Sequence, residues 1–243
     1  LVFDGGSDGP FLEDLRSTVL GDYLKSRPGH EEYFHYWQSS INGNLLLELL
    51  DPPKKLELKN SSQVSDAFSD FKFSPAVLEL RDLALKKFNL SEGTIWLSIL
   101  SSAIKRLTGM RCPYISLSVD SRLAFPGSEQ MAGLFLQAIP VSIPPGDLDN
   151  SLALLNKNFI EVLSTAGNRF TYPTGQNAFD YHQIGLIVQH NFFNKDDGNI
   201  KGLTFKPMAF GEREARLPLS LYVDPENQSL GLETKGEYFT TKE

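Results

Sequence analysis

Apolar residues recur at helical spacing in the first fifty residues of the chain. One run lies between residues 10 and 24, directly after Ser7 and Asp8, either of which can cap a helix. A second run begins near Glu31 and stops near Asn42, just before a glycine. The pattern predicts two amphipathic helices in this part of the sequence.

Two further helices are predicted in the middle of the chain. Ser74 and Pro75 form a good helix start, because serine caps helices and proline is favoured in the first turn. Residues 92–108 are apolar on nearly all sides, which predicts a buried helix that ends at Thr108 and Gly109. The helix after Pro75 is expected to bury a stripe formed by Val77, Leu80, Leu83, Ala84 and Phe88.

Strand patterns fill much of the remaining sequence. Residues 51–70 are mixed and predict a weakly defined strand pair or a crossover. One more helix is predicted over residues 148–163. A turn is predicted at Asp224-Pro225-Glu226-Asn227, between the last two strands. Alternating or continuous apolar runs predict six further strands, at 114–119, 134–143, 184–188, 203–210, 217–223 and 230–234.

This order of elements predicts an α/β fold, a two-layer sandwich in which helices pack on a mixed sheet. Helices and strands do not alternate one for one, so a doubly wound sheet is not expected. Neither G-x-G-x-x-G nor the P-loop pattern follows a strand, so a nucleotide site lacks its usual signature. We expect one unit over 1–243, with a loop and helices over 1–50 and the α/β part over 51–243.

Composition and charge exclude several classes of protein. Hydrophobic residues make up 41% of the 243 residues, enough for a packed core, and no run of about 20 apolar residues could cross a bilayer. The net charge of -7, with basic residues spread evenly, argues against nucleic acid. Cys112 is the only cysteine, and the four histidines have no zinc-ligand spacing. We therefore expect a cytoplasmic protein without a metal, nucleic acid or membrane partner.

The first residues carry a family resemblance. Leu1-Val2-Phe3-Asp4-Gly5 is similar to the last five residues of a His-His-x-x-x-Asp-Gly motif, and Asp4-Gly5-Gly6-Ser7 is similar to Asp-Gly-x-Ser. That motif marks the chloramphenicol acetyltransferase superfamily, which includes the condensation domains of nonribosomal peptide synthetases. The resemblance implies that both histidines precede residue 1. An ordinary turn is the alternative for Asp-Gly alone.

Three later segments resemble the same family in order and spacing. Ser118-Val119-Asp120-Ser121-Arg122 is similar to its Gly-x-x-x-x-x-Arg turn. Residues 131–141 are similar to Ile-Gly-x-Phe-Val-Asn-Thr-x-Pro-x-Arg, although the final arginine is absent. Residues 169–173 are similar to Asp-Tyr-Pro-Phe and lead to a strand that ends near Gln189.

The resemblance implies roles for the residues around the motif. Asp4 would form an ion pair with Arg122 that holds the histidine loop, and two unrelated surface charges are the alternative. Gly5 and Gly6 would let the backbone approach a thioester, and an amide there could donate to an oxyanion. Ser7 would cap the next helix or contact a phosphopantetheine arm.

Four polar residues are placed by the resemblance on the acceptor side of a tunnel: Gln137, Gln189, His190 and Asn191. Two of them depart from the family pattern, because Gln137 stands where asparagine is usual and His190 occupies part of a Gln-Asn strand end. We interpret His190 as part of a pocket wall and not as the catalytic base. Solvent-exposed strand ends are the alternative for all four.

The resemblance thus implies a chloramphenicol acetyltransferase-like fold and the C-terminal lobe of a condensation domain. Such a domain is an acyltransferase-type enzyme of secondary metabolite biosynthesis, which joins a carrier-bound acyl or peptidyl thioester to a carrier-bound aminoacyl amine. The catalytic histidine would lie outside this chain, so the isolated fragment is expected to be inactive. No cofactor is bound directly, because phosphopantetheine arms of the carriers bring the substrates. The implied partners are the N-terminal lobe, upstream and downstream carrier proteins, and an adenylation domain.

Two alternatives stay open at this point. An epimerization domain shares the fold and the motif, and would invert the α-carbon of a tethered aminoacyl group. A non-catalytic carrier-docking module would keep the fold for interaction alone. The second histidine of the motif and a glutamate on a missing or unmatched strand would decide for epimerization. The residues immediately upstream of Leu1 would separate the other readings: His-His supports transfer, Asp-x-x-x-x-Asp would indicate cyclisation, and neither would favour docking.

Overall fold

The computed structural model describes residues 8–27, 31–32, 35, 45–46, 56, 66–110, 113–124, 127–133, 135–142, 156–157, 170–171, 177–188, 199–200, 203–204 and 215–238. Three helices lie in these ranges, namely α1 (Asp8–Leu20), α3 (Pro75–Phe88) and α4 (Glu92–Thr108). Residues 31–32 and 35 are also helical, in agreement with the helix expected from Glu31, whose remainder lies outside the described residues.

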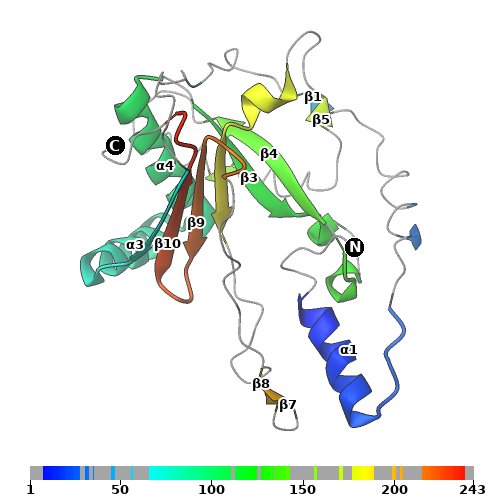
Figure 1. Ribbon diagram of the computed structural model, residues 1–243. Helices are drawn as coiled ribbons and strands as arrows, with labels where there is room; N and C mark the ends of the chain where they lie inside the picture. The colour runs from blue at the N-terminus through cyan, green and yellow to red at the C-terminus, as the bar shows by residue number, and fades with distance from the viewer. Residues whose placement is uncertain are drawn as a thin grey trace.

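A six-stranded mixed sheet forms the centre of the fold (Figure 1). β3, β6 and β9 run parallel, whereas β4, β10 and β2 each pair antiparallel with their neighbours. This sheet confirms the α/β class expected from the sequence. The strands, in order across the sheet, are β2 (Ala67–Lys72), β10 (Ser229–Thr234), β9 (Leu219–Asp224), β6 (Ile184–Val188), β3 (Tyr114–Asp120) and β4 (Leu136–Ser142).

Two short pairs lie outside this sheet. β1 (Leu45–Leu46) is parallel to β5 (Phe170–Thr171), and β7 (Asn199–Ile200) is antiparallel to β8 (Leu203–Thr204). β8 covers only the start of the strand predicted at 203–210, and the rest of that prediction lies outside the described residues. Asn156 and Lys157 are helical, but the other residues of the predicted 148–163 helix are likewise outside.

α4 supplies the helical side of the core. The Ser91 side chain accepts a hydrogen bond from the Thr94 amide at 3.1 Å, and Gly109 ends the helix with a φ of 71°, which glycine adopts at little cost. The apolar face of α4 packs with the central strands, so that Leu97 of the helix and Leu186 of β6 are fully buried. The predicted buried helix is therefore confirmed, although Ile99 and Leu107 are exposed.

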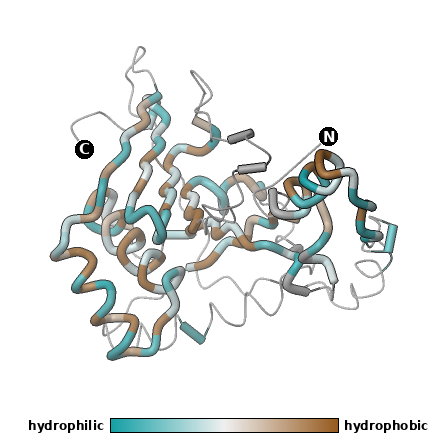
Figure 2. The backbone as a smooth tube through the Cα atoms, turned by 90° about the horizontal axis from the view of Figure 1, so that it is seen from below, coloured by the Kyte–Doolittle hydropathy of each residue, from teal (hydrophilic) through white to brown (hydrophobic). Residues whose placement is uncertain are grey.

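The buried stripe predicted for α3 is wrong. The helix begins where expected, with Ser74 as its cap, but none of its residues is buried, and Leu80 is 66% exposed. α4 covers the sheet, so α3 lies against α4 in an outer position, where Arg81 Nε contacts Glu92 Oε1 at 3.2 Å. Apolar residues recur along α3 in Figure 2, and among them Val77, Leu80, Leu83 and Phe88 are exposed.

β2 and β4 are the two edge strands of the described sheet, and Pro140 lies in β4. It lies opposite Ser116 of β3 and is buried. Proline has no amide hydrogen to donate to a second neighbour, so it is tolerated in an edge strand. The turn predicted at 224–227 is confirmed, because the Asn227 amide donates to Asp224 Oδ1 at 2.9 Å and links β9 to β10.

α1 lies away from the sheet, beyond the ends of β3 and β4 (Figure 1). Two 3-10 turns, η2 (Ser121–Ala124) and η3 (Ser128–Gln130), lie between the sheet and this helix. The division of the chain near residue 50 that the sequence suggests stays a prediction.

The contrast between α4 and α3 gives a stability test. Replacing Leu97 with alanine should lower the free energy of unfolding by about 3 kcal/mol, because a fully buried leucine leaves a cavity. Leu80→Ala, on the exposed face of α3, should change it by less than about 0.5 kcal/mol. Urea unfolding of both variants in dilute solution measures the difference, and equal losses would contradict the placement of α3.

Candidate functional site

Arg122 is the second residue of η2, which follows directly after β3. Its guanidinium forms an ion pair with Asp120, with Nη1 3.1 Å from Oδ2 and 3.2 Å from Oδ1. Nε donates to the Met131 carbonyl at 3.2 Å, and Nη2 donates to the Gly133 carbonyl at 3.1 Å. The side chain is only 4% exposed, so these partners replace water around a charged group.

Phe135 and two serines complete this cluster. The Arg122 guanidinium carbon lies 4.2 Å from the centre of the Phe135 ring, in the position of a cation–π contact. The Ser121 amide and hydroxyl both donate to the Phe135 carbonyl, at 2.8 and 2.6 Å, and the Ser128 hydroxyl donates to the Arg122 carbonyl. The cluster thus joins the two segments that resemble the family, 118–122 and 131–135, into one unit.

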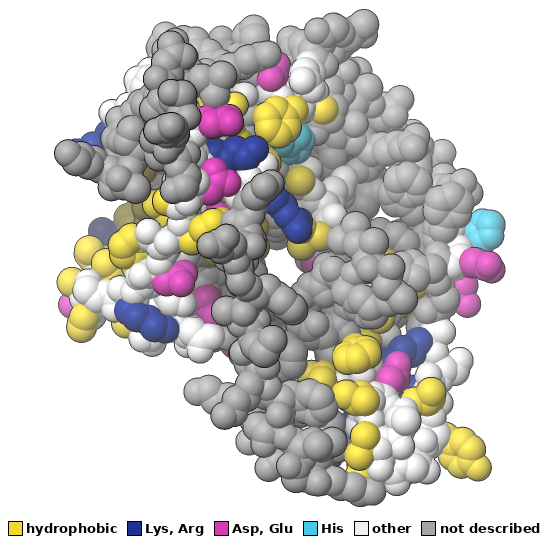
Figure 3. All heavy atoms as spheres, in the orientation of Figure 1, with side chains coloured by type: hydrophobic (Ala, Val, Ile, Leu, Met, Phe, Trp, Pro, Cys, Tyr) yellow, Lys and Arg dark blue, Asp and Glu magenta, His cyan; other side chains and the backbone are white. Residues whose placement is uncertain are grey.

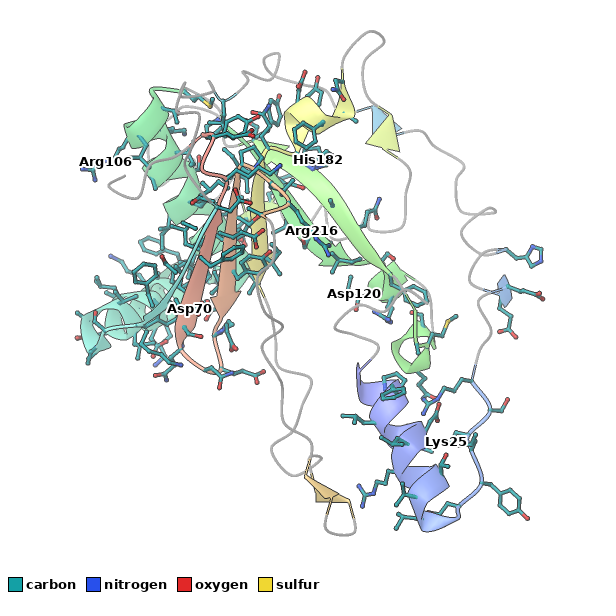
Figure 4. All side chains as sticks on the ribbon, viewed as in Figure 1. Lys25, Asp70, Arg106, Asp120, His182 and Arg216 are labelled. Atoms are coloured by element: carbon teal, nitrogen blue, oxygen red, sulfur yellow. The ribbon has the colours of Figure 1, made fainter. Side chains whose placement is uncertain are left out.

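Arg27 links this unit to α1. Its Nη2 contacts Asp14 at 2.8 Å and Glu13 at 2.9 Å, and its Nη1 donates to the carbonyl of Gln130 in η3 at 3.2 Å. The hydrogen bond with Asp14 is the main cause that raises the pKa of Arg27. The hydrogen bonds from Lys25 and then Arg27 lower the pKa of Glu13. Figure 4 shows Lys25 on the segment after α1 and Asp120 on the β3 side of the junction.

The structure describes two of the predicted site residues, Arg122 and Gln137. Gln137 lies on β4 directly opposite Val119, one position from the Asp120–Leu136 pair, so it belongs to the same end of the β3–β4 ladder as Arg122. Arg122 is held by Asp120, and its predicted ion pair with Asp4 stays a prediction. The other site residues lie outside the described residues: Asp4, Gly5, Gly6, Ser7, Gln189, His190 and Asn191.

The sequence reasoning missed Asp120 as a partner of Arg122 and Arg27 as the link to α1. The first could have been found, because an Asp-x-Arg spacing at a strand end lets the carboxylate accept from the backbone amide two residues later, here at 2.9 Å. The second had no local signal, since Arg27 and Gln130 are 103 residues apart. Only the tertiary fold brings them together.

Two other polar clusters lie on the sheet. His182 Nδ1 is 2.7 Å from the Ser116 hydroxyl, and burial lowers the pKa of His182. Glu233 is 3% exposed and accepts hydrogen bonds from the Tyr222 hydroxyl and the Arg216 amide, both at 2.9 Å. Glu233 also lines a cavity of about 240 Å³ between β2, β10 and β9. Among the described residues no group of ligands could hold a metal ion.

The comparisons with known proteins identify the fold. No family model matches the sequence, and no curated protein matches it. The condensation domain from monacolin K polyketide synthase is 13% identical with a TM-score of 0.71, over 98% of this chain and 63% of that one. The X-domain from teicoplanin biosynthesis is 14% identical with a TM-score of 0.74, over 99% of this chain and 63% of that one.

The epimerization domain from the third module of tyrocidine synthetase B is 14% identical with a TM-score of 0.68, over 100% of this chain and 63% of that one. The chain therefore has the chloramphenicol acetyltransferase-like fold of condensation-type domains, as the sequence resemblance implies. It spans about 63% of the length of these three structures. No helix in the described ranges is long and apolar enough to cross a membrane.

Removing the Arg122 side chain should loosen this junction. We expect Arg122→Ala to lower the free energy of unfolding by about 3 kcal/mol, because the Met131 and Gly133 carbonyls and Asp120 lose their donor. Arg16→Ala, an exposed arginine on α1, is the matched control and should change it by less than about 0.5 kcal/mol. Chemical unfolding measures both, and a loss in Arg122→Ala no larger than in the control would contradict the role of the cluster.

His182 predicts a dependence of stability on pH. Burial lowers the pKa of His182 in the folded state below its ordinary value of about 6.5, which applies to the unfolded chain. Between these two pKa values the unfolded chain binds a proton that the folded chain does not. The free energy of unfolding should therefore fall as the pH drops from about 6.5 toward the lower pKa of the folded state. His182→Gln keeps a hydrogen-bonding group beside Ser116 but should flatten this part of the curve. An identical slope in both proteins, measured by urea unfolding, would contradict the assignment.

Proposed function

We propose that this chain is the C-terminal lobe of a condensation domain that forms an amide bond between two carrier-bound substrates. One observation carries the proposal: two of the segments that resemble the family, 118–122 and the start of 131–141, meet around the buried guanidinium of Arg122. Segment 118–122 and segment 131–135 are joined by its hydrogen bonds. α1, which follows the Asp4-Gly5 segment, is tied to the same place through Arg27.

The chemistry proposed for the whole domain follows from tethered substrates. A histidine of the motif upstream of Leu1 would take a proton from the attacking amine or orient it, and the amine would displace the donor thioester. Holding both substrates on phosphopantetheine arms would supply much of the acceleration through positioning. The residues of this chain would hold the motif loop through Asp4 and Arg122. Gln137, Gln189, His190 and Asn191 would line the acceptor side.

We also propose that an N-terminal lobe of the same domain covers α1. The chain spans about 63% of the condensation-type structures it resembles, and α1 lies away from the sheet with no described layer on its outer side. Hydrophobic side chains gather over α1 in Figure 3. Phe11 and Leu20 of α1 are 51% and 38% exposed, and Leu24, four residues after its end, is 60% exposed. Exposed apolar side chains gathered on one part of a surface favour a protein partner.

The remaining partners of this proposal are the upstream and downstream carrier proteins and an adenylation domain, in the cytoplasm. A docking module is the second candidate, and one observation favours it. The X-domain in the complex of the X-domain and OxyB from teicoplanin biosynthesis is 12% identical with a TM-score of 0.70, over 99% of this chain and 61% of that one. A domain with this fold has thus been solved bound to another protein.

The proposal is tested with the chain joined to the upstream lobe as one domain. The complete domain should form an amide between an acyl carrier thioester and an aminoacyl carrier thioester, detected by mass spectrometry of the acceptor carrier. Alanine at the second motif histidine should lower the rate by about 100-fold or more. The 243-residue chain alone should stay at background.

Three other outcomes would overturn the condensation assignment. Turnover by the isolated chain would place the catalytic group within it. Exchange of the α-hydrogen of a tethered aminoacyl group, without amide formation, would indicate epimerization. Carrier binding without either reaction would indicate a docking module.

A further inference from the structure

Arg27 uses all three nitrogens of its guanidinium, and one of them reaches from α1 to another part of the chain. Nε donates to Asp14 Oδ1 at 3.2 Å. Nη2 contacts Asp14, Glu13 and the Pro10 carbonyl, at 2.8, 2.9 and 3.2 Å. Nη1 donates to the Gln130 carbonyl of η3 at 3.2 Å. The side chain is only 12% exposed, so these protein groups take the place of water around the charge.

The hydrogen bond to the Pro10 carbonyl fastens the part of α1 that is nearest to the motif segment Asp4-Gly5-Gly6-Ser7. α1 begins at Asp8, directly after that segment, and Pro10 lies in the first turn of the helix. Pro10 is buried, and so is Leu12 in the same turn. Because the motif segment and this turn are consecutive in the chain, a shift of the turn carries the end of the motif segment with it.

The other end of the Arg27 contact lies beside the Arg122 cluster. The Gln130 carbonyl accepts from Arg27, and the carbonyl of the next residue, Met131, accepts from Arg122 Nε, at 3.2 Å in both cases. The Met131 amide donates to the Ser128 carbonyl at 2.9 Å, and Met131 is 2% exposed. The segment 130–131 is therefore held by one guanidinium from the side of α1 and by another from the side of β3.

Two carboxylates fix the orientation of the Arg27 guanidinium. The hydrogen bond with Asp14 is the main cause that raises the pKa of Arg27, and hydrogen bonds from Lys25 and then Arg27 lower the pKa of Glu13. The planar fork that these contacts hold directs Nη1 at the Gln130 carbonyl. Lysine carries its donors on a single nitrogen, so it could keep one carboxylate contact but could not reproduce the whole set.

We propose that Arg27 is a positioning residue for the reaction of the complete domain. Its guanidinium sets where α1, and the motif segment before it, lies relative to the end of the β3–β4 ladder that holds Arg122 and Gln137. The inference rests on the proposed condensation function, in which a motif histidine serves the attacking amine and Gln137 lines the acceptor side. Arg27 acts through α1 and not by contact with a substrate. A displacement of about 1 Å far from the reacting atoms can cost on the order of 100-fold in rate.

The substitution Arg27→Lys, made in the complete domain, tests this role. It keeps a positive charge beside Asp14 but loses the fixed reach to the Gln130 carbonyl. We expect kcat to fall about tenfold and KM for each carrier to change by less than about twofold, because alignment is lost and carrier binding is not. Arg16→Lys, the same change at an exposed arginine of α1, is the matched control and should leave both values unchanged. Thermal unfolding of each variant checks that the domain is folded at the assay temperature.

A second substitution separates positioning from a general loss of structure. If Arg27 acts by placing the motif histidine, its effect should largely vanish once that histidine is removed. In a domain with alanine at the second motif histidine, Arg27→Lys should therefore lower the residual rate by less than about twofold. A tenfold loss in both backgrounds would mean that Arg27 has a structural role only, and unchanged kcat in the otherwise wild-type domain would also overturn the proposal.

Hydrogen exchange of the 243-residue chain tests the contact without any turnover. Arg27→Lys should speed amide exchange in α1 by at least about tenfold and leave exchange in α4 unchanged, because only α1 depends on this guanidinium. Unchanged exchange in α1 would contradict the proposal even where the wild-type domain is active. A wild-type domain that makes no amide would instead overturn the proposed function, and the role of Arg27 in the reaction with it.

Discussion

A buried guanidinium has to have its charge and its donors satisfied by protein groups. At Arg122 this requirement organises the end of the molecule where two of the family-like segments, 118–122 and the start of 131–141, meet. The ion pair with Asp120 balances the charge, and the Met131 and Gly133 carbonyls accept further hydrogen bonds from the guanidinium. Because those carbonyls belong to a different segment, satisfying Arg122 also fixes the path of the chain into β4. A charge that cost free energy to bury thereby specifies a local structure.

The same junction explains how α1 is positioned without lying on the sheet. Arg27 is bound by two carboxylates of α1 and reaches the Gln130 carbonyl of η3, which begins six residues after Arg122. The helix is therefore held through polar contacts, while part of its apolar surface stays exposed. This combination, a polar anchor on one side and exposed apolar residues on the other, is compatible with the N-terminal lobe proposed above.

The central strands of the sheet are buried, whereas its edge strands β2 and β4 carry exposed residues. α4 covers the central strands, and the buried residues of β3, β6 and β9 form one hydrophobic cluster with it. At one edge of the described sheet Pro140 of β4 has no amide hydrogen to donate, and at the other edge β2 pairs with β10 among the described strands. The apolar residues of α3 are exposed because α4 already occupies the space on the sheet.

The sequence by itself determined the local elements, because caps and periodicity act over a few residues. Ser74 begins α3, Gly109 ends α4, and Asp224 begins the last turn, all where the pattern indicated. The motif spacing also indicated the condensation-type fold. Only the tertiary structure decided which amphipathic helix reaches the sheet, because α3 and α4 compete for one face and the pattern of each is compatible with burial. Likewise, the contact between Arg27 and Gln130 depends on chain segments far apart in sequence, which no local signal encodes.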